Sequence, residues 1–323
     1  MKIENVDLDV KLMPFIINKE FRGSATKPVY GVEMIKAKSI WQESQKGAGV
    51  KIAVIDSGCD IEHESLKNNI IGVRNFTDED KKNPNIVIDR VGHGTHVIGT
   101  ICANGNAITG VAPEAQIYVL KAINRTGTGK LSWVINAIKY AVEQKVDIIS
   151  MSLGLSENNV KLEKAIKEAV NKNIVVVCAA GNEGDGNADS FEYSYPAAYI
   201  DVIAVGAVDK KGVPAKFSNS NKSIDVVAPG VDIMSTYPNN QFAVMSGTSM
   251  ATPHVAGSLA LLKNWSKNEF KRNLTQEELY AQLIKHTKVL DYSRTVQGNG
   301  LVYLKDEKNM KKTLKIFEKS VDF

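Results

Sequence analysis

Short apolar runs rich in valine and isoleucine recur along the chain and are separated by amphipathic segments. The runs cover residues 51–55, 117–121, 148–153, 174–179 and 202–208. Continuous apolar runs of this length are typical of parallel strands that are buried on both faces. Residues 132–144 and 162–170 instead repeat apolar side chains at helical spacing. This alternation predicts an α/β fold, with a mostly parallel twisted sheet and helices on both of its faces.

The two ends of the chain differ from this pattern. Residues 1–24 hold a short apolar cluster at 12–17, which predicts an extended arm outside the main sheet, followed by a flexible link at 22–26. Residues 306–323 place Met310, Leu314, Phe317 and Val321 at spacings that predict an amphipathic helix. Such a helix lies on the protein's own surface or binds a partner. We therefore divide the chain into an N-terminal extension (1–24), a body (25–305) and a C-terminal tail (306–323).

Composition excludes several classes of protein. The chain has 323 residues, 40 Lys and Arg against 36 Asp and Glu, and a net charge of +4, which gives no reason to expect a nucleic-acid partner. No apolar stretch is long enough for a membrane helix or resembles the core of a signal peptide. Three cysteines (Cys59, Cys102 and Cys178) form neither a disulfide framework nor a Cys-x-x-Cys pair. We expect a cytoplasmic protein with no membrane partner.

Three segments carry side chains that packing alone does not require. Asp56 follows the first apolar run, His93 and His96 lie in a Gly-His-Gly-Thr-His motif, and Ser249 follows a glycine at the start of a helix. Each has a simpler explanation, since Asp forms turns and Ser caps helices. A metal site at the two histidines lacks a third ligand. Pro253 falls in the first turn of the last helix, where proline is tolerated.

Together the three residue types indicate nucleophilic catalysis. A serine hydroxyl attacks a carbonyl only when a base takes its proton, and histidine is the natural base near neutral pH. A buried carboxylate fixes the tautomer of that histidine and stabilises its protonated form. The chain order Asp, His, Ser is one of the known orders for this constellation.

These motifs resemble those of the subtilisin-like serine peptidases. Val54–Gly58, His93–His96 and Gly247–His254 match the three signatures of that family, and the resemblance extends over about residues 28–303. It implies a serine endopeptidase that cleaves peptide and protein substrates through an acyl-enzyme, with Asp56, His93 and Ser249 as the catalytic residues. It also implies that the Asn182 side chain and the Ser249 backbone N–H form the oxyanion hole.

The same resemblance implies a groove for an extended peptide. Ser152, Leu153 and Gly154 match one edge of the groove, and Gly127 and Gly129 match the facing loop. The matched walls of the primary pocket are Ala179, Ala180 and Ser194, which are uncharged, so we expect the pocket to accept apolar or uncharged side chains. Leu131 and Val134 are expected to shape a second apolar pocket.

The short extension resembles that of the intracellular branch of the family. Leu12, Met13, Pro14 and Phe15 match an inhibitory motif that lies across the active site, where a proline shifts the bond out of register. The resemblance therefore implies a zymogen for intracellular protein turnover that is activated by cleavage near residues 16–26. A homodimer is compatible with this branch.

Departures from the family pattern concern calcium and the remaining histidines. The chemistry needs no cofactor. The main structural calcium site of the family is in doubt here, because Ser65 replaces an aspartate and the loop at 103–109 is short. A weaker cation site at Asp225 remains, with Ser223 in place of its usual glutamate. We expect His96 and His254 to be structural. We expect His63 and His286 to lie at the surface. The cysteines are expected to be small buried residues, whose closeness to the catalytic residues still favours inhibition by thiol reagents.

Two alternatives remain from the sequence. One is a dedicated processing peptidase for a single peptide precursor. The other is an inactive peptide-binding protein with the same fold.

Overall fold

A nine-stranded sheet forms the centre of the computed structural model, which describes residues 7–21 and 29–304. The strands pair in parallel except for the last pair, β14 and β15. In spatial order they are β14 (Thr287–Lys288), β15 (Leu301–Val302), β11 (Ile224–Pro229), β10 (Ile203–Val208), β9 (Val175–Ala179), β7 (Ile148–Met151), β3 (Lys51–Asp56), β5 (Gln116–Lys121) and β4 (Ile70–Asn75).

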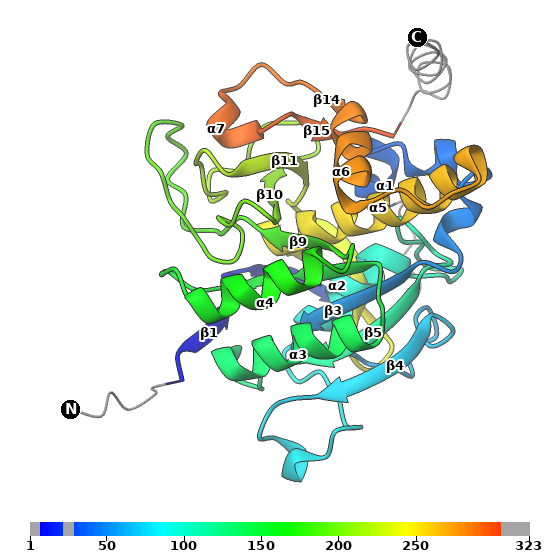
Figure 1. Ribbon diagram of the computed structural model, residues 1–323, viewed down its shortest axis with the longest axis vertical. Helices are drawn as coiled ribbons and strands as arrows, with labels where there is room; N and C mark the ends of the chain where they lie inside the picture. The colour runs from blue at the N-terminus through cyan, green and yellow to red at the C-terminus, as the bar shows by residue number, and fades with distance from the viewer. Residues whose placement is uncertain (1–6, 22–28, 305–323) are drawn as a thin grey trace.

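Helices cover both faces of this sheet (Figure 1). The α-helices are α1 (Tyr30–Met34), α2 (His93–Cys102), α3 (Leu131–Glu143), α4 (Val160–Val170), α5 (Thr248–Phe270), α6 (Gln276–Lys285) and α7 (Arg294–Gln297). Short 3-10 turns lie at η1 (Ala37–Ile40), η2 (Gln45–Gly47) and η3 (Asp80–Lys82). The sequence-based prediction of a mostly parallel sheet between two helical layers is confirmed.

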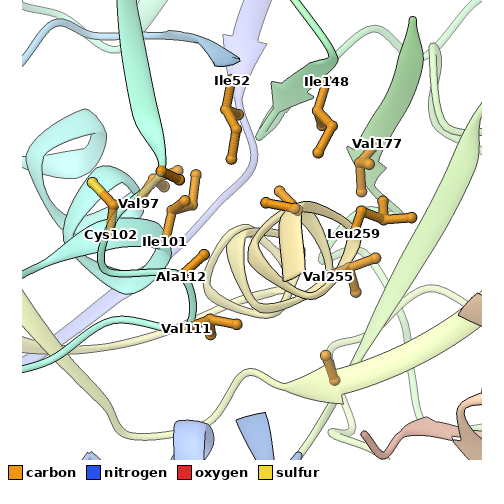
Figure 2. Close-up of a cluster of buried hydrophobic side chains, with 14 of the residues drawn as sticks. Ile52, Val97, Ile101, Cys102, Val111, Ala112, Ile148, Val177, Val255 and Leu259 are labelled. Atoms are coloured by element: carbon orange, nitrogen blue, oxygen red, sulfur yellow. The ribbon is translucent and has the colours of Figure 1, made fainter. Parts of the chain in front are cut away.

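Alternate residues of the central strands enter two separate apolar cores. Ile52 and Val54 of β3 pack toward α2 and α5, whereas Ala53 and Ile55 pack toward α3 and α4. Figure 2 shows the first core around α5, which is seen along its axis with Val255 and Leu259 facing the strands. Burial on both faces explains why these strands are apolar throughout rather than alternating.

Two smaller sheets flank the main one and contain the N-terminal extension. The first is β6 (Thr128–Lys130), β1 (Asp9–Leu12) and β8 (Leu153–Gly154), and the second is β12 (Ile233–Tyr237), β13 (Gln241–Ser246) and β2 (Ile16–Phe21). The extension therefore lies outside the main sheet, as predicted. The predicted link at 22–26 and the predicted tail helix at 306–323 fall outside the described residues.

The prediction for Pro253 was wrong. Helix α5 begins at Thr248, so Pro253 is its sixth residue and lies beyond the first turn. Proline has no N–H to donate to the carbonyl four residues before it, which is that of Ser249. The Ser152 hydroxyl donates to this carbonyl instead, at 3.3 Å.

We predict that Ile101→Ala lowers the free energy of unfolding by about 2–5 kcal/mol, because it empties part of the core between α2 and the sheet. Ile101 is fully buried in this core (Figure 2). Urea unfolding measures the change. Ile200→Ala is the matched control, since Ile200 is 94% exposed; equal losses in the two variants would contradict the packing assignment.

Candidate active site

The carboxyl end of β3 brings an acidic side chain to the start of α2. Strand β3 lies where the strand order reverses, with β5 on one side and β7 on the other, and open α/β sheets place their sites at such a point. The His93 Nδ1–H donates to Asp56, with distances of 2.8 Å to Oδ1 and 3.0 Å to Oδ2. Both side chains are buried.

Glycines on both sides of His93 allow this close packing. Gly92 is left-handed at φ 87° and precedes α2. A Cβ at Gly94 would collide with the Gly58 carbonyl oxygen. Only a residue without a side chain therefore lets the start of α2 approach the end of β3.

Asp89 and Ser57 tie the two elements together, and sequence reasoning overlooked both. Asp89 Oδ1 accepts from the Ser57 hydroxyl at 2.9 Å and from the Gly92 N–H at 2.8 Å, and its Oδ2 accepts from the Thr95 N–H at 2.8 Å. The Ser57 hydroxyl oxygen in turn accepts from the Gly94 N–H at 3.0 Å. An acidic residue just before a helix start is the signal that could have identified Asp89.

Lys121 is a third residue at this junction that sequence reasoning overlooked. It ends β5 with a fully buried side chain, and Nζ donates to the Ser57 carbonyl at 2.6 Å. Burial lowers the pKa of this ammonium, while Glu79, 3.3 Å away, acts in the opposite direction. A lysine at the end of an otherwise apolar run is the sequence signal that could have identified Lys121.

Ser249 lies in the first turn of α5, which packs beside α2. Its Oγ and His93 Nε2 are both buried, and neither has a hydrogen-bond partner among the described residues. The structure therefore brings Asp56 and His93 into direct contact but records no hydrogen bond between His93 and Ser249. Unpaired buried polar atoms are costly, and these two lie at the starts of α2 and α5.

Asn182 is oriented by the same helix start. Its Oδ1 accepts from the Thr248 N–H at 2.8 Å, which turns Nδ2 toward Gly247. Nδ2 donates to the carbonyl oxygen of Pro14 at 2.5 Å. Asn182 therefore links the start of α5 to the Pro14 carbonyl, accepting from the one and donating to the other.

The predicted groove residues lie along one path, which β1 occupies. Val10 pairs with Gly129 of β6, and Leu12 pairs with Leu153 of β8. The Leu12 N–H donates to the Gly127 carbonyl at 3.0 Å, and the Met13 N–H to the Ser152 carbonyl at 3.4 Å. Val10 and Leu12 belong to the same buried cluster as Leu131 and Val134.

Met13 lies against predicted walls of the primary pocket. Its Sδ is 3.9 Å from the Ser194 hydroxyl, and a Cβ at Gly154 would collide with Met13 Cε. Ala179 ends β9 and Ala180 follows it, both buried. The ring of Phe15 packs on the His93 ring at a centroid distance of 4.8 Å.

All four remaining histidines are buried, although two of them were predicted to lie at the surface. His96 Nε2 lies 3.0 Å from the Ile233 carbonyl oxygen, and His254 Nδ1 lies 2.8 Å from that of Met250. Burial lowers the pKa of His96 to about 3 and that of His254 to about 4. The prediction that His63 and His286 lie at the surface was wrong, because both are buried, and Nε2 of His63 is 3.0 Å from the Gln241 carbonyl oxygen.

The cysteines are free and buried. Burial raises the pKa of all three thiols, and Asp89 adds to this effect at Cys59. Because the thiolate is the reactive form, these environments argue against the expected inhibition by thiol reagents.

The positions considered for calcium fit that ion poorly. Both carboxylate oxygens of Asp225 accept hydrogen bonds, from the Ala204 N–H at 2.8 Å and from the Tyr280 hydroxyl at 2.7 Å. Glu64 is the single carboxylate that lines the surface hollow of about 560 Å³ beside Ser65. Within residues 7–21 and 29–304, no three or more His, Cys, Asp or Glu side chains gather as a metal site.

Comparisons with known proteins identify the class. Residues 47–311 match the model of the subtilase family, peptidase S8, and the chain therefore belongs to that family. It is 52% identical over 297 residues to an intracellular serine protease of Paenibacillus polymyxa, which covers 91% of this chain and 90% of that protein. It is 49% identical over 299 residues to the major intracellular serine protease of Bacillus subtilis (92% and 93% covered), and 42% identical over 257 residues to subtilisin E of the same species (78% and 66% covered).

These findings confirm the resemblance drawn from the three motifs, and with it a subtilisin-like serine peptidase as the kind of enzyme. Across the described part of the chain, no helix has the length and apolar character needed to span a membrane.

We predict that His96 and His254 make folding weaker in mild acid. Both stay neutral in the folded protein, whereas the unfolded chain takes up protons near pH 6.5. The free energy of unfolding therefore keeps its full value above about pH 6.5. It falls between there and pH 4, by about 1.4 kcal/mol per pH unit for each histidine. Urea unfolding of Ser249→Ala between pH 7 and pH 5 measures the slope, above the range in which carboxylates titrate.

His254→Asn is the control for this measurement. It should reduce the slope of the free energy of unfolding against pH by about 1.4 kcal/mol per pH unit, which corresponds to one proton. A stability that stays constant between pH 7 and pH 5 would show that the two imidazoles are not held neutral.

Proposed function

We propose that the protein is a serine endopeptidase in which Ser249 is the nucleophile, His93 the general base and Asp56 the carboxylate that orients it. Ser249 Oγ attacks the substrate carbonyl carbon while His93 Nε2 accepts the hydroxyl proton. Nε2 then gives that proton to the leaving amine, which leaves an acyl-enzyme, and water repeats the sequence to release the acid. The Asp56–His93 hydrogen bonds and the two unpaired buried atoms support these roles.

The observation that carries the proposal is that the chain's own extension follows the path of a substrate. Strand β1 lies antiparallel between β6 and β8, which is how an extended peptide adds to two open strand edges. Two residues beyond β1, the carbonyl of Pro14 accepts a hydrogen bond from Asn182. In a substrate, this oxygen would carry the negative charge of the tetrahedral intermediate, which Asn182 and the Ser249 N–H would stabilise.

A register mismatch supports an inhibitory role for Leu12, Met13, Pro14 and Phe15. In a productive substrate, one residue both fills the primary pocket and presents its carbonyl to Asn182. Here Met13 contacts Ser194, one predicted wall of the pocket, whereas Pro14 supplies the carbonyl. Proline cannot donate a hydrogen bond and has a fixed φ, so the segment binds as a strand without placing Met13 for attack.

The wider role that we propose is protein turnover in the cytoplasm by a zymogen whose extension is removed by cleavage. The two intracellular proteases named above support this role. A dedicated processing peptidase is the alternative, and cleavage of a whole-proteome digest separates the two: many cleaved sequences favour turnover, and one narrow motif favours processing. We propose no cofactor for the chemistry, and substrate proteins rather than nucleic acid as partners.

A fluorophosphonate probe tests the chemistry. We expect it to label Ser249 once the extension is removed, because the reagent needs an activated serine. Mass spectrometry of the labelled peptide locates the adduct, with Ser249→Ala and the exposed Ser39→Ala as paired controls. If the trimmed protein with an intact Ser249 stays unlabelled, the reading as an inactive peptide-binding protein replaces the proposal.

We predict that Pro14→Ala turns the extension into a substrate. Alanine restores the N–H and the backbone freedom that allow Met13 to shift its carbonyl into the position now held by Pro14. A time course by mass spectrometry should show cleavage after Met13 at least about tenfold faster than in the unaltered chain. A decrease of about 1.4 kcal/mol in the activation free energy is enough for this change in rate.

Lys11→Ala is the control, because the Lys11 side chain on β1 is exposed and should not affect register. Equal trimming rates in the Pro14 and Lys11 variants would contradict the inhibitory mechanism.

A further inference from the structure

After passing the proposed catalytic residues, the extension forms a second strand, β2, beyond the cleft. Strand β2 lies antiparallel to β13, with Ile16 opposite Ser246 and Phe21 opposite Phe242. The other edge of β13 is paired with β12. Removal of the extension would therefore expose a strand edge that continues the path of the cleft, and an open edge can accept another extended chain.

An irregularity in this pairing directs one side chain out of the strand. Ile17 is opposite Met245 and Lys19 is opposite Val244, so Asn18 is an extra residue on β2. Bulges of this kind re-aim a side chain. The Asn18 amide donates to the Asp232 carboxylate and, at 3.2 Å, to the Ser246 hydroxyl oxygen.

The two acceptors are held in place by the body of the protein. The Asp232 N–H donates to the Ser246 hydroxyl oxygen at 2.8 Å, which joins the turn before β12 to the end of β13. Asp232 adopts a left-handed φ of 53°, and the Tyr30 hydroxyl binds the carbonyl of the preceding residue, Val231. A carboxylate and a hydroxyl oxygen thus face Asn18 from a fixed turn.

We propose that Asp232 and Ser246 form a substrate subsite that selects a cationic or hydrogen-bond-donating side chain at the fourth residue after the scissile bond. The position follows from counting from Pro14, whose carbonyl faces Asn182, to Asn18. A carboxylate attracts lysine or arginine more strongly than a neutral amide and repels an acid. This inference rests on the proposed endopeptidase function and identifies the class of substrate: extended polypeptides with a donor at that position.

Synthetic peptides test the subsite. Each carries Asp-Val-Lys-Leu-Met before the bond, as in residues 9–13, and six residues after it, with Lys, Gln or Glu at the fourth. The protein is first incubated until its own extension is gone. We expect kcat/KM to be about three- to tenfold higher for Lys than for Glu, as for a partly exposed ion pair, and the ratio to shrink in high salt. Moving the lysine to the third or fifth residue should reduce the preference.

Variants of the turn provide the control. Asp232→Asn suits the left-handed backbone and should abolish the preference for lysine, and Asp232→Lys should reverse it toward glutamate. Asp291→Lys makes the same charge change at another exposed aspartate and should leave the preference unchanged. Cleavage of every peptide with equal kcat/KM, or the same behaviour in the Asp232 and Asp291 variants, overturns the subsite alone. If no peptide is cleaved, the proposed function fails, and this inference fails with it.

Discussion

The contact between the end of β3 and the start of α2 is the constraint on which the site depends. It sets the hydrogen bonds from His93 to Asp56, and it exists because Gly94 leaves room against the Gly58 carbonyl. The Asp89 carboxylate and the Ser57 hydroxyl join the same two elements. A buried imidazole keeps one orientation only when the surrounding polar groups are themselves paired, because an unpaired group would favour a shifted backbone.

Under the function that we propose, the extension uses the same backbone groups that a substrate would use. Its strands pair with the edges of β6, β8 and β13, so the hydrogen bonds of these edges are satisfied within one chain. Because the segment is covalently attached, its effective concentration at the cleft is high, and modest contacts keep it bound. The offset between Met13 and Pro14 explains how such a segment resists cleavage under the function that we propose.

Several features of the fold could be read from the sequence, and others could not. The five predicted strands and the predicted helices at 132–144 and 162–170 are apolar in uninterrupted or helical patterns, which local burial produces directly. Strand β4 escaped prediction because Gly72 and Arg74 break the pattern at a partly exposed edge. His63 and His286 look like surface residues in a polar context, and only packing against distant segments buries them.

By itself the sequence determined the family, the order of its Asp, His and Ser motifs, and an extension with a proline in its motif, since these depend on local identity. The tertiary structure decided which atoms meet. Asp56 meets His93, and Asn182 meets the start of α5, although each pair lies far apart in the chain; the parallel sheet and the packing of α2 and α5 bring the partners together. Asp89 and Lys121 as positioning residues, the one-residue offset in the cleft and the Asp232–Ser246 pair appear only there, because each depends on contacts between segments whose separation no local pattern encodes.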